Sequence, residues 1–147
     1  MSSVIDYEKC PRCGGIVSTE FDCRTSEIWK QCGTCGKTEG WHYERDENYD
    51  VILDENGSPK KTIDDFGGYG VASLNFGAVG VTYAFESNSD NELREAFYEE
   101  IEKNDKIVKE KCYLTVWDDE KKIVVAEFGT LPETYDELEA RTKAETD

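Results

Sequence analysis

The residues best suited to chemistry are four cysteines in two C-x-x-C pairs, at positions 10–13 and 32–35. Eighteen residues lie between the pairs, a spacing typical of a zinc site of the form C-x2-C…C-x2-C. Glycine follows each pair and can adopt positive φ at little cost, which lets backbone N–H groups turn toward the thiolates. The pattern predicts a metal site with four ligands: Cys10, Cys13, Cys32 and Cys35.

Four thiolates fill the tetrahedral coordination shell of Zn²⁺ and leave no open position for a substrate. The sequence therefore predicts one structural Zn²⁺ and no catalytic metal. Iron is the alternative, because rubredoxin-like iron proteins share this type of turn. An iron protein of that type would be red, whereas the zinc protein would be colourless.

The pattern C-P-x-C-G-G…C-x-x-C-G, with aromatic residues on the connecting segments, resembles the zinc-ribbon superfamily over about residues 8–46. The resemblance implies three short antiparallel strands, at about 16–21, 27–31 and 38–43. Zinc ribbons occur in transcription and translation proteins, in phage proteins and in enzymes. The resemblance therefore predicts a metal and a fold for this segment, and it leaves the function open.

The rest of the chain predicts an α+β fold: an antiparallel sheet with two helices, following the ribbon. We expect two domains, a zinc ribbon over 1–47 and an acidic α+β domain over 48–147. Alternation of apolar residues, the Asn-Gly turn and two S/T-x-x-E/Q-like capping patterns indicate the elements of the second domain. These are a hairpin of 49–54 with 60–64, a strand near 79–85, a helix from 89–92 to about Lys103, a hairpin of 112–117 with 123–128, and a terminal helix after 130–133.

Charge is unevenly distributed along the chain, whose formal net charge is −16. Residues 1–46 hold 6 basic and 8 acidic side chains, whereas residues 47–147 hold 11 and 25. An acidic segment such as 47–147 repels nucleic-acid phosphates and favours binding to basic protein surfaces. We therefore expect a non-enzymatic protein, such as a small bacterial or phage adaptor or inhibitor, whose partner is a protein with a basic surface.

Two other functions remain open at this point. Nucleic-acid binding through the ribbon would use Trp29, Trp41 and Tyr43 as a stacking platform, although packing or docking against the second domain is the preferred interpretation. An enzyme with a site in the α+β domain is the third hypothesis, for which the sequence offers no catalytic set.

Three further residues have side chains that could do chemistry. Cys23 lies between the pairs and has no C-x-x-C partner, and Cys112 falls on a strand as a small buried side chain. His42, on the expected third strand, is interpreted as exposed. The chain starts without a basic segment followed by an apolar run, and it has no membrane-length apolar stretch. We therefore expect a cytoplasmic protein without a membrane partner; the sequence does not indicate an oligomeric state.

Overall fold

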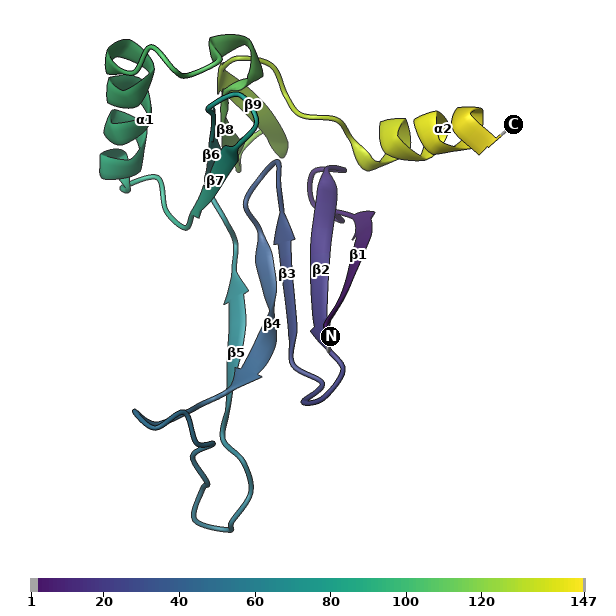
Figure 1. Cartoon of the computed structure of the whole chain (residues 1–147), viewed down its shortest axis with the longest axis vertical. Coiled ribbons are helices and arrows are strands. Elements are labelled where there is room, and N and C mark those ends of the chain that lie inside the picture. Colours follow the sequence, from purple (N-terminus) through teal and green to yellow (C-terminus); the bar gives the residue numbers. More distant parts are fainter. Residues whose placement is uncertain (1–2, 147) are drawn as a thin grey trace.

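Two antiparallel sheets account for the nine strands found within residues 3–146, the part of the chain that this computed structural model describes (Figure 1). The first sheet follows chain order: β1 (Ser3–Lys9), β2 (Ile16–Asp22), β3 (Ile28–Cys32), β4 (Thr38–Tyr43) and β5 (Lys61–Phe66). The second has the order β7-β6-β8-β9, formed by β6 (Gly70–Asn75), β7 (Gly80–Phe85), β8 (Tyr113–Asp118) and β9 (Ile123–Phe128). The helices are α1 (Asn91–Lys103), a single 3-10 turn at Lys109–Lys111, and α2 (Tyr135–Thr146). The predicted α+β class is confirmed.

The first sheet is wider than the three-stranded ribbon predicted from the sequence. Strands β2, β3 and β4 match the predicted strands, while β1 pairs with β2 along its whole length and had no sequence signal. β5 pairs with β4 from Lys61–Tyr43 to Phe66–Thr38. The predicted pairing of 60–64 with 49–54 is therefore wrong over most of its length. Next to the predicted turn it survives as the Leu53–Pro59 bridge and the bond from Lys60 N–H to the Ile52 carbonyl at 2.9 Å. The first sheet thus continues past residue 47, where the domain boundary was predicted.

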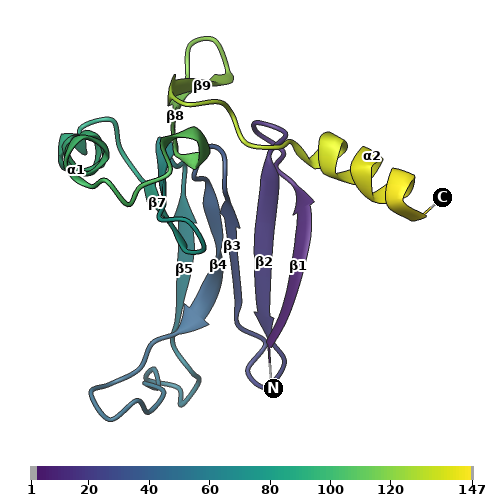
Figure 2. The ribbon, with the colours of Figure 1, turned by 45° about the horizontal axis from the view of Figure 1, so that its top comes forward.

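The second sheet sits at one end of the first, and the long β4–β5 connection lies at the other end (Figures 1 and 2). Its two central strands, β6 and β8, are buried on both faces. Alternate residues of a strand point to opposite faces, so each of these strands serves two different contacts. Ala72 and Leu74 of β6 and Leu114 and Val116 of β8 form one apolar core.

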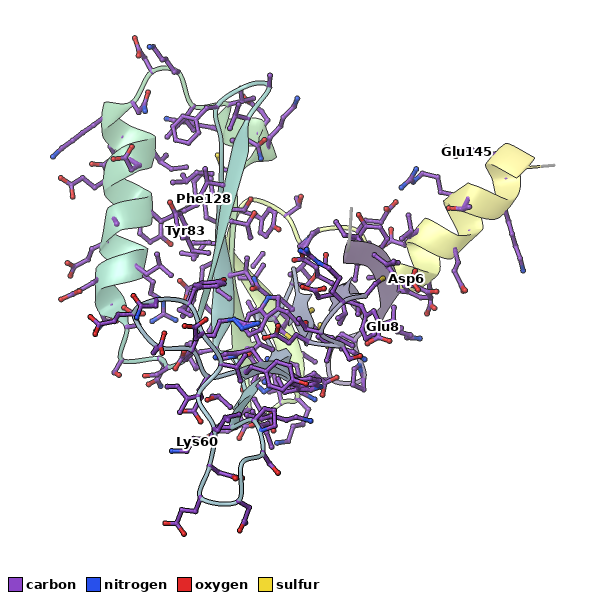
Figure 3. The ribbon with its side chains drawn as sticks, turned by 60° about the horizontal axis from the view of Figure 1, so that its bottom comes forward. Asp6, Glu8, Lys60, Tyr83, Phe128 and Glu145 are labelled. Atoms are coloured by element: carbon purple, nitrogen blue, oxygen red, sulfur yellow. The ribbon has the colours of Figure 1, made fainter. Side chains whose placement is uncertain are left out.

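Helix α1 closes this core from one side. Phe97 and Ile101 are buried in it and Leu93 packs at its margin, which confirms the apolar stripe that the sequence predicted. The Phe97 ring meets Phe128 of β9 edge-on, with centroids 5.5 Å apart. Figure 3 shows Tyr83 and Phe128 on the side of the second sheet that faces α1. The opposite face of β6 and β8 is left for a contact with the first sheet.

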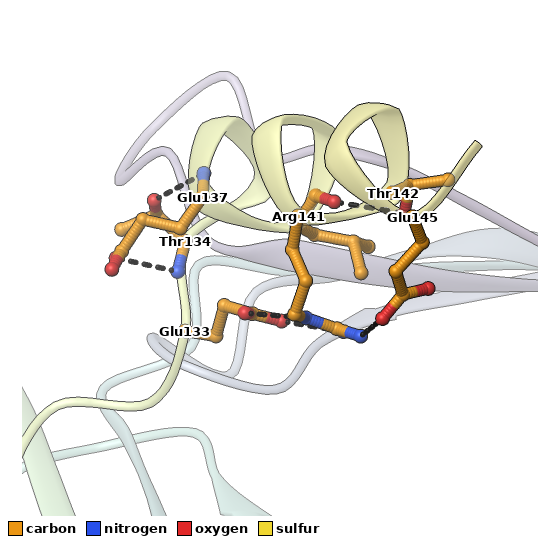
Figure 4. Close-up of polar contacts among 7 residues, drawn as sticks. Glu133, Thr134, Glu137, Arg141, Thr142 and Glu145 are labelled. Carbon is orange, nitrogen blue, oxygen red and sulfur yellow. Dashed lines mark hydrogen bonds and ion pairs between the residues drawn. The ribbon is translucent and has the colours of Figure 1, made fainter. Parts of the chain in front are cut away.

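Both helices form where expected, but their caps differ from the predicted ones. Asp90 is the N-cap residue of α1 and makes no side-chain capping bond, so the capping box at 89–92 is wrong. At α2 the box lies four residues later than predicted: Thr134 N–H donates to Glu137 at 3.1 Å and Glu137 N–H donates to Thr134 Oγ1 at 3.2 Å (Figure 4). Arg141 then pairs with Glu133 at 3.1 Å.

Candidate metal centre

Two turns of similar backbone geometry carry the four cysteines, and we call residues 10–15 the first knuckle and 32–37 the second. The N–H of Cys10 donates to the carbonyl of Gly15, and the N–H of Cys32 donates to that of Lys37, both at 2.9 Å. Gly14 and Gly36, each four residues after the first cysteine, have φ of 78° and 81°. Glycine makes this left-handed conformation accessible, so each C-x-x-C-G segment closes on itself and turns its thiols inward.

The structure brings the four predicted cysteines into one cluster. Their sulfur atoms all lie within 4.8 Å of one another, with Cys10–Cys35 at 3.8 Å and Cys13–Cys32 at 3.5 Å. A tetrahedral metal–thiolate site, with bonds of about 2.3 Å, separates its sulfurs by about 3.8 Å. The spacing and the donor type therefore fit a metal ion held by four thiolates.

Backbone N–H groups favour charged sulfur at this place, whereas burial opposes it. Gly15 N–H donates to the Cys13 sulfur at 3.3 Å, and the Thr34 and Cys35 N–H groups donate to the Cys32 sulfur at 3.4 Å. Cys10, Cys32 and Cys35 are buried, while Cys13 is partly exposed. These donors stabilise thiolates, whereas burial away from water raises the pKa of the thiols, so the charged form depends on such donors or on a bound cation.

Ionisation of one thiol opposes ionisation of its neighbours in this cluster. Hydrogen bonds from the Cys13, Cys32 and Cys35 thiols lower the pKa of Cys10. The bond to Cys10, and those to Cys32 and Cys35, raise the pKa of Cys13. One thiolate thus forms at the expense of its neighbours, since like charges close together oppose ionisation. A divalent cation would remove this conflict by pairing with all four sulfurs.

Side chains of β8, in the second sheet, donate hydrogen bonds to the backbone of the second knuckle. The hydroxyl of Thr115, which is fully buried, donates to the Thr34 carbonyl and contacts the Val71 carbonyl at 3.4 Å. The Tyr113 hydroxyl donates to the Gly33 carbonyl at 3.0 Å. Residues 113 and 115 point to the same face of β8, opposite the α1 core. The cysteine cluster therefore lies where the two sheets meet, and we call this contact of the second knuckle with β6 and β8 the joint.

Glycines let the backbones meet closely at this joint. A Cβ on Gly36 would lie 2.5 Å from the Gly70 carbonyl oxygen, and one on Gly68 would lie 2.3 Å from the Gly36 carbonyl carbon. Both residues also have positive φ. Any larger side chain would force the second knuckle away from β6.

Arg12, inside the first knuckle, completes the joint. Its guanidinium donates to the carbonyls of Cys35 at 3.2 Å and Gly68 at 2.8 Å, and it lies 4.4 Å from the centre of the Trp117 ring. Trp117 is buried in the same cluster as Cys10, Cys32 and Cys35. A cation here partly offsets the net negative charge that four thiolates and one divalent ion would carry. Arg12, Tyr113, Thr115 and Trp117 were missed by sequence reasoning, because no motif marks a contact made across the fold.

The remaining candidate residues lie away from the cluster. Cys23 is exposed in the β2–β3 turn, at the end of the first sheet opposite the knuckles. Cys112 is buried in the α1 core, where its thiol contacts the Val108 carbonyl at 3.4 Å, as the sequence predicted. His42 is exposed on β4, four residues or about 13 Å along the strand from Thr38 at the knuckle end.

Among the described side chains, Trp29, Trp41 and Tyr43 belong to neither buried cluster of the second sheet, contrary to one part of the preferred interpretation. The rings of Trp41 and Tyr43 pack edge-on with centroids 5.1 Å apart. Lys61 of β5 places its ammonium 4.3 Å from the Trp41 ring centre. Trp29 lies on the opposite face of the sheet and is 38% exposed. Trp41 and Tyr43 therefore pack against neighbours within the first sheet.

Comparison with known proteins adds no relative. No family model matches the chain, and neither the curated proteins nor the solved structures include a significant match. Within residues 3–146, the helices are all too short or too polar to cross a membrane. The resemblance to a zinc ribbon therefore rests on the cysteine cluster and the strands that carry it.

Proposed function

We propose that the cluster holds one structural Zn²⁺ and that this ion fixes the joint between the sheets. The support is the donor set: four thiolates, N–H groups aimed at the sulfurs, and no fifth side chain in the cluster among the described residues. Zinc prefers such a closed tetrahedral shell in structural sites. Elemental analysis of reduced protein tests this, with one equivalent of zinc expected; a red protein with bound iron would refute it.

The protein built around this ion acts, in our proposal, as a non-enzymatic adaptor that binds a partner with a basic surface. The observation that carries it is the charge: residues 47–147 hold 25 acidic and 11 basic side chains. The outer face of α1 displays exposed glutamates, among them Glu95, Glu99 and Glu102. Such a surface attracts cationic proteins over a distance set by the salt concentration.

A salt-dependent capture experiment tests this function. The full chain, loaded with zinc and immobilised, is exposed to an extract of its source organism at low and at moderate salt. We expect basic proteins to be enriched at low salt and largely released at moderate salt. Replacing Glu95, Glu99 and Glu102 by Gln should reduce the capture. Partners retained equally at both salt concentrations would contradict the proposal.

Nucleic-acid binding is the second candidate, supported by the exposed ring of Trp29 and by Lys61 beside Trp41. Against it stands the net charge of −16, since non-specific affinity for nucleic acid comes from Lys and Arg neutralising phosphates. We expect the intact zinc-loaded chain to leave single- and double-stranded DNA and RNA unshifted in a gel at low salt. A shift that Trp29→Ala abolishes would favour the second candidate.

A further inference from the structure

A row of apolar side chains crosses the whole first sheet, far from the knuckles. The strand register places these residues side by side on one face, because paired residues of antiparallel strands point the same way. We call them the apolar row: Val4, Phe21, Ile28, Trp41 and Ile63, one from each strand from β1 to β5. Such a row on a single sheet face normally packs against another layer.

The apolar row is open to solvent. Ile63 is 78% exposed, Val4 is 54% exposed and Phe21 is 37% exposed. A groove of about 620 Å³ lies over β3, β4 and β5, and Ile28, Trp41 and Ile63 form its floor. The second sheet contacts the first at the knuckle end, as described above, and so leaves this face uncovered.

Carboxylates border the apolar row on its knuckle side. The next row of the same face is Asp6, Thr19, Lys30, Glu39 and Asp65. Its one cation, Lys30, is already held by Glu8 at 2.8 Å and lies 3.9 Å from Glu39. Figure 3 labels Asp6 and Glu8 along β1. The border is therefore negative, even after its internal ion pairs are counted.

The ring of Trp41 already accommodates a cation. Lys61 places its ammonium 4.3 Å from the Trp41 ring centre and 5.8 Å from that of Tyr43. An ammonium over an indole gains from the ring's negative face. The Lys61 side chain is exposed and flexible, so a lysine or arginine from another molecule can take its place.

We propose that this face docks a cationic segment of a partner protein, with apolar side chains on the apolar row and basic side chains over the carboxylate border. The proposal rests on the proposed adaptor function and adds an anchoring site for the partner to the long-range attraction of the α1 glutamates. A second copy of the chain fits less well, because stacking two such faces brings two acidic borders together. Anionic lipid and nucleic acid are disfavoured by the same border.

Three synthetic peptides test the chemistry of the occupant on the zinc-loaded full chain. The first is an oligolysine with two interior lysines replaced by phenylalanine, the second is plain oligolysine, and the third has glutamine in place of every lysine of the first. We expect the first to bind at least about tenfold more tightly than either of the others, since apolar anchors contribute most of the energy at interface centres. Equal binding of the first two peptides would overturn the proposal.

A matched pair of variants locates the site. Ile63→Ser removes an exposed apolar side chain from the apolar row, and Val79→Ser removes one, 62% exposed, from the β6–β7 turn of the second sheet. Ile63→Ser should weaken the lysine–phenylalanine peptide about tenfold while plain oligolysine is unaffected. Val79→Ser should change neither. Amide shifts induced by the peptide should cluster at residues 28, 41 and 63, and a cluster elsewhere would refute the docking face.

The outcomes separate this inference from the function on which it rests. If none of the cationic peptides binds at low salt, both the adaptor function and the docking face fail. If oligolysine binds but Ile63→Ser leaves the lysine–phenylalanine peptide unchanged, the docking face alone fails. Dimerisation of the free chain that Ile63→Ser abolishes would also overturn it, because the occupant would then be a second copy.

Discussion

The two ends of the first sheet differ in what covers them. At the knuckle end, Cys32, Cys35 and Thr38 are almost inaccessible to solvent, and side chains of β8 hold the backbone of the second knuckle. At the other end the apolar row is exposed, and Ile63 shows 78% of its surface. The same five strands thus combine a fixed end with an open one.

The difference shows how a small sheet can keep an open face. A sheet normally gains its stability by burying one face against another layer. Here the burial is concentrated at the joint, where sulfur, glycine backbone and β8 meet, and a bound metal would add its binding energy to the folding energy. The open end is then free to present side chains that stability does not require to be buried.

Loss of one metal-binding cysteine should unfold the fixed end of the first sheet. We expect it to have the largest effect on stability. We expect Cys32→Ser to lose zinc and to unfold the joint, because structural zinc contributes about 10–16 kcal/mol in small zinc domains. Metal content and urea unfolding measure this. Cys23→Ser, at the exposed turn of the open end, is the matched control and should change stability by less than about 0.5 kcal/mol. Full zinc stoichiometry in Cys32→Ser would remove Cys32 from the ligand set.

Phe97→Ala tests whether the second sheet depends on its own core. Phe97 is 1% exposed between α1 and the sheet, so its truncation should cost about 3–5 kcal/mol. The knuckles contact the opposite face of β6 and β8, and zinc should therefore remain at one equivalent in the folded variant. Urea unfolding followed with metal analysis checks both statements. Loss of zinc at native conditions would mean that the α1 core and the joint are inseparable.

Local signals in the sequence were sufficient for the cysteine cluster and for α1. The ligand spacing is set within two short turns, and the stripe of Leu93, Phe97 and Ile101 follows from helical periodicity. The hairpin of β8 and β9 was also predicted, because two apolar runs flank a short polar turn. Each of these features is decided by residues close together in the chain.

Features decided by distant residues could not be predicted. The partner of Lys61–Phe66 is β4, about twenty residues earlier, and no pattern within 61–66 selects it over residues 49–54. The contact of Thr115 with Thr34 likewise joins residues far apart in sequence. The capping box of α2 was misplaced for a local reason: Leu131 precedes Pro132, which disfavours helical backbone at Leu131, so the helix begins after the next threonine.

Thr115→Val should loosen the fixed end without destroying it. The substitution keeps the shape of the side chain but leaves the Thr34 carbonyl without the Thr115 hydroxyl, at a cost of about 1–3 kcal/mol for a buried acceptor. Thr38→Val is the matched control: its buried hydroxyl has no hydrogen-bond partner within residues 3–146, so valine should be neutral or stabilising. Urea unfolding of both variants decides the matter, and equal effects would contradict the role of Thr115.

The smallest effect is expected at the open end, from the pair of Glu27 and Arg45. Partial burial raises the pKa of Glu27, but hydrogen bonds from Thr25 and the Tyr43 backbone, with the charge of Arg45, lower it overall. A carboxylate with a lowered pKa stabilises the fold above its unfolded value of about 4.3 and loses that contribution as pH falls through the folded value. Glu27→Gln should therefore lower the free energy of unfolding by less than about 1 kcal/mol at neutral pH, and this deficit should disappear in acid.

Urea unfolding of the original protein and the variant across this pH range measures the deficit. Glu55→Gln, in the exposed turn of the β4–β5 connection, removes the same charge as a control. A deficit that persists at acid pH, or one of equal size in the control, would show that the ion pair does not stabilise this end of the sheet.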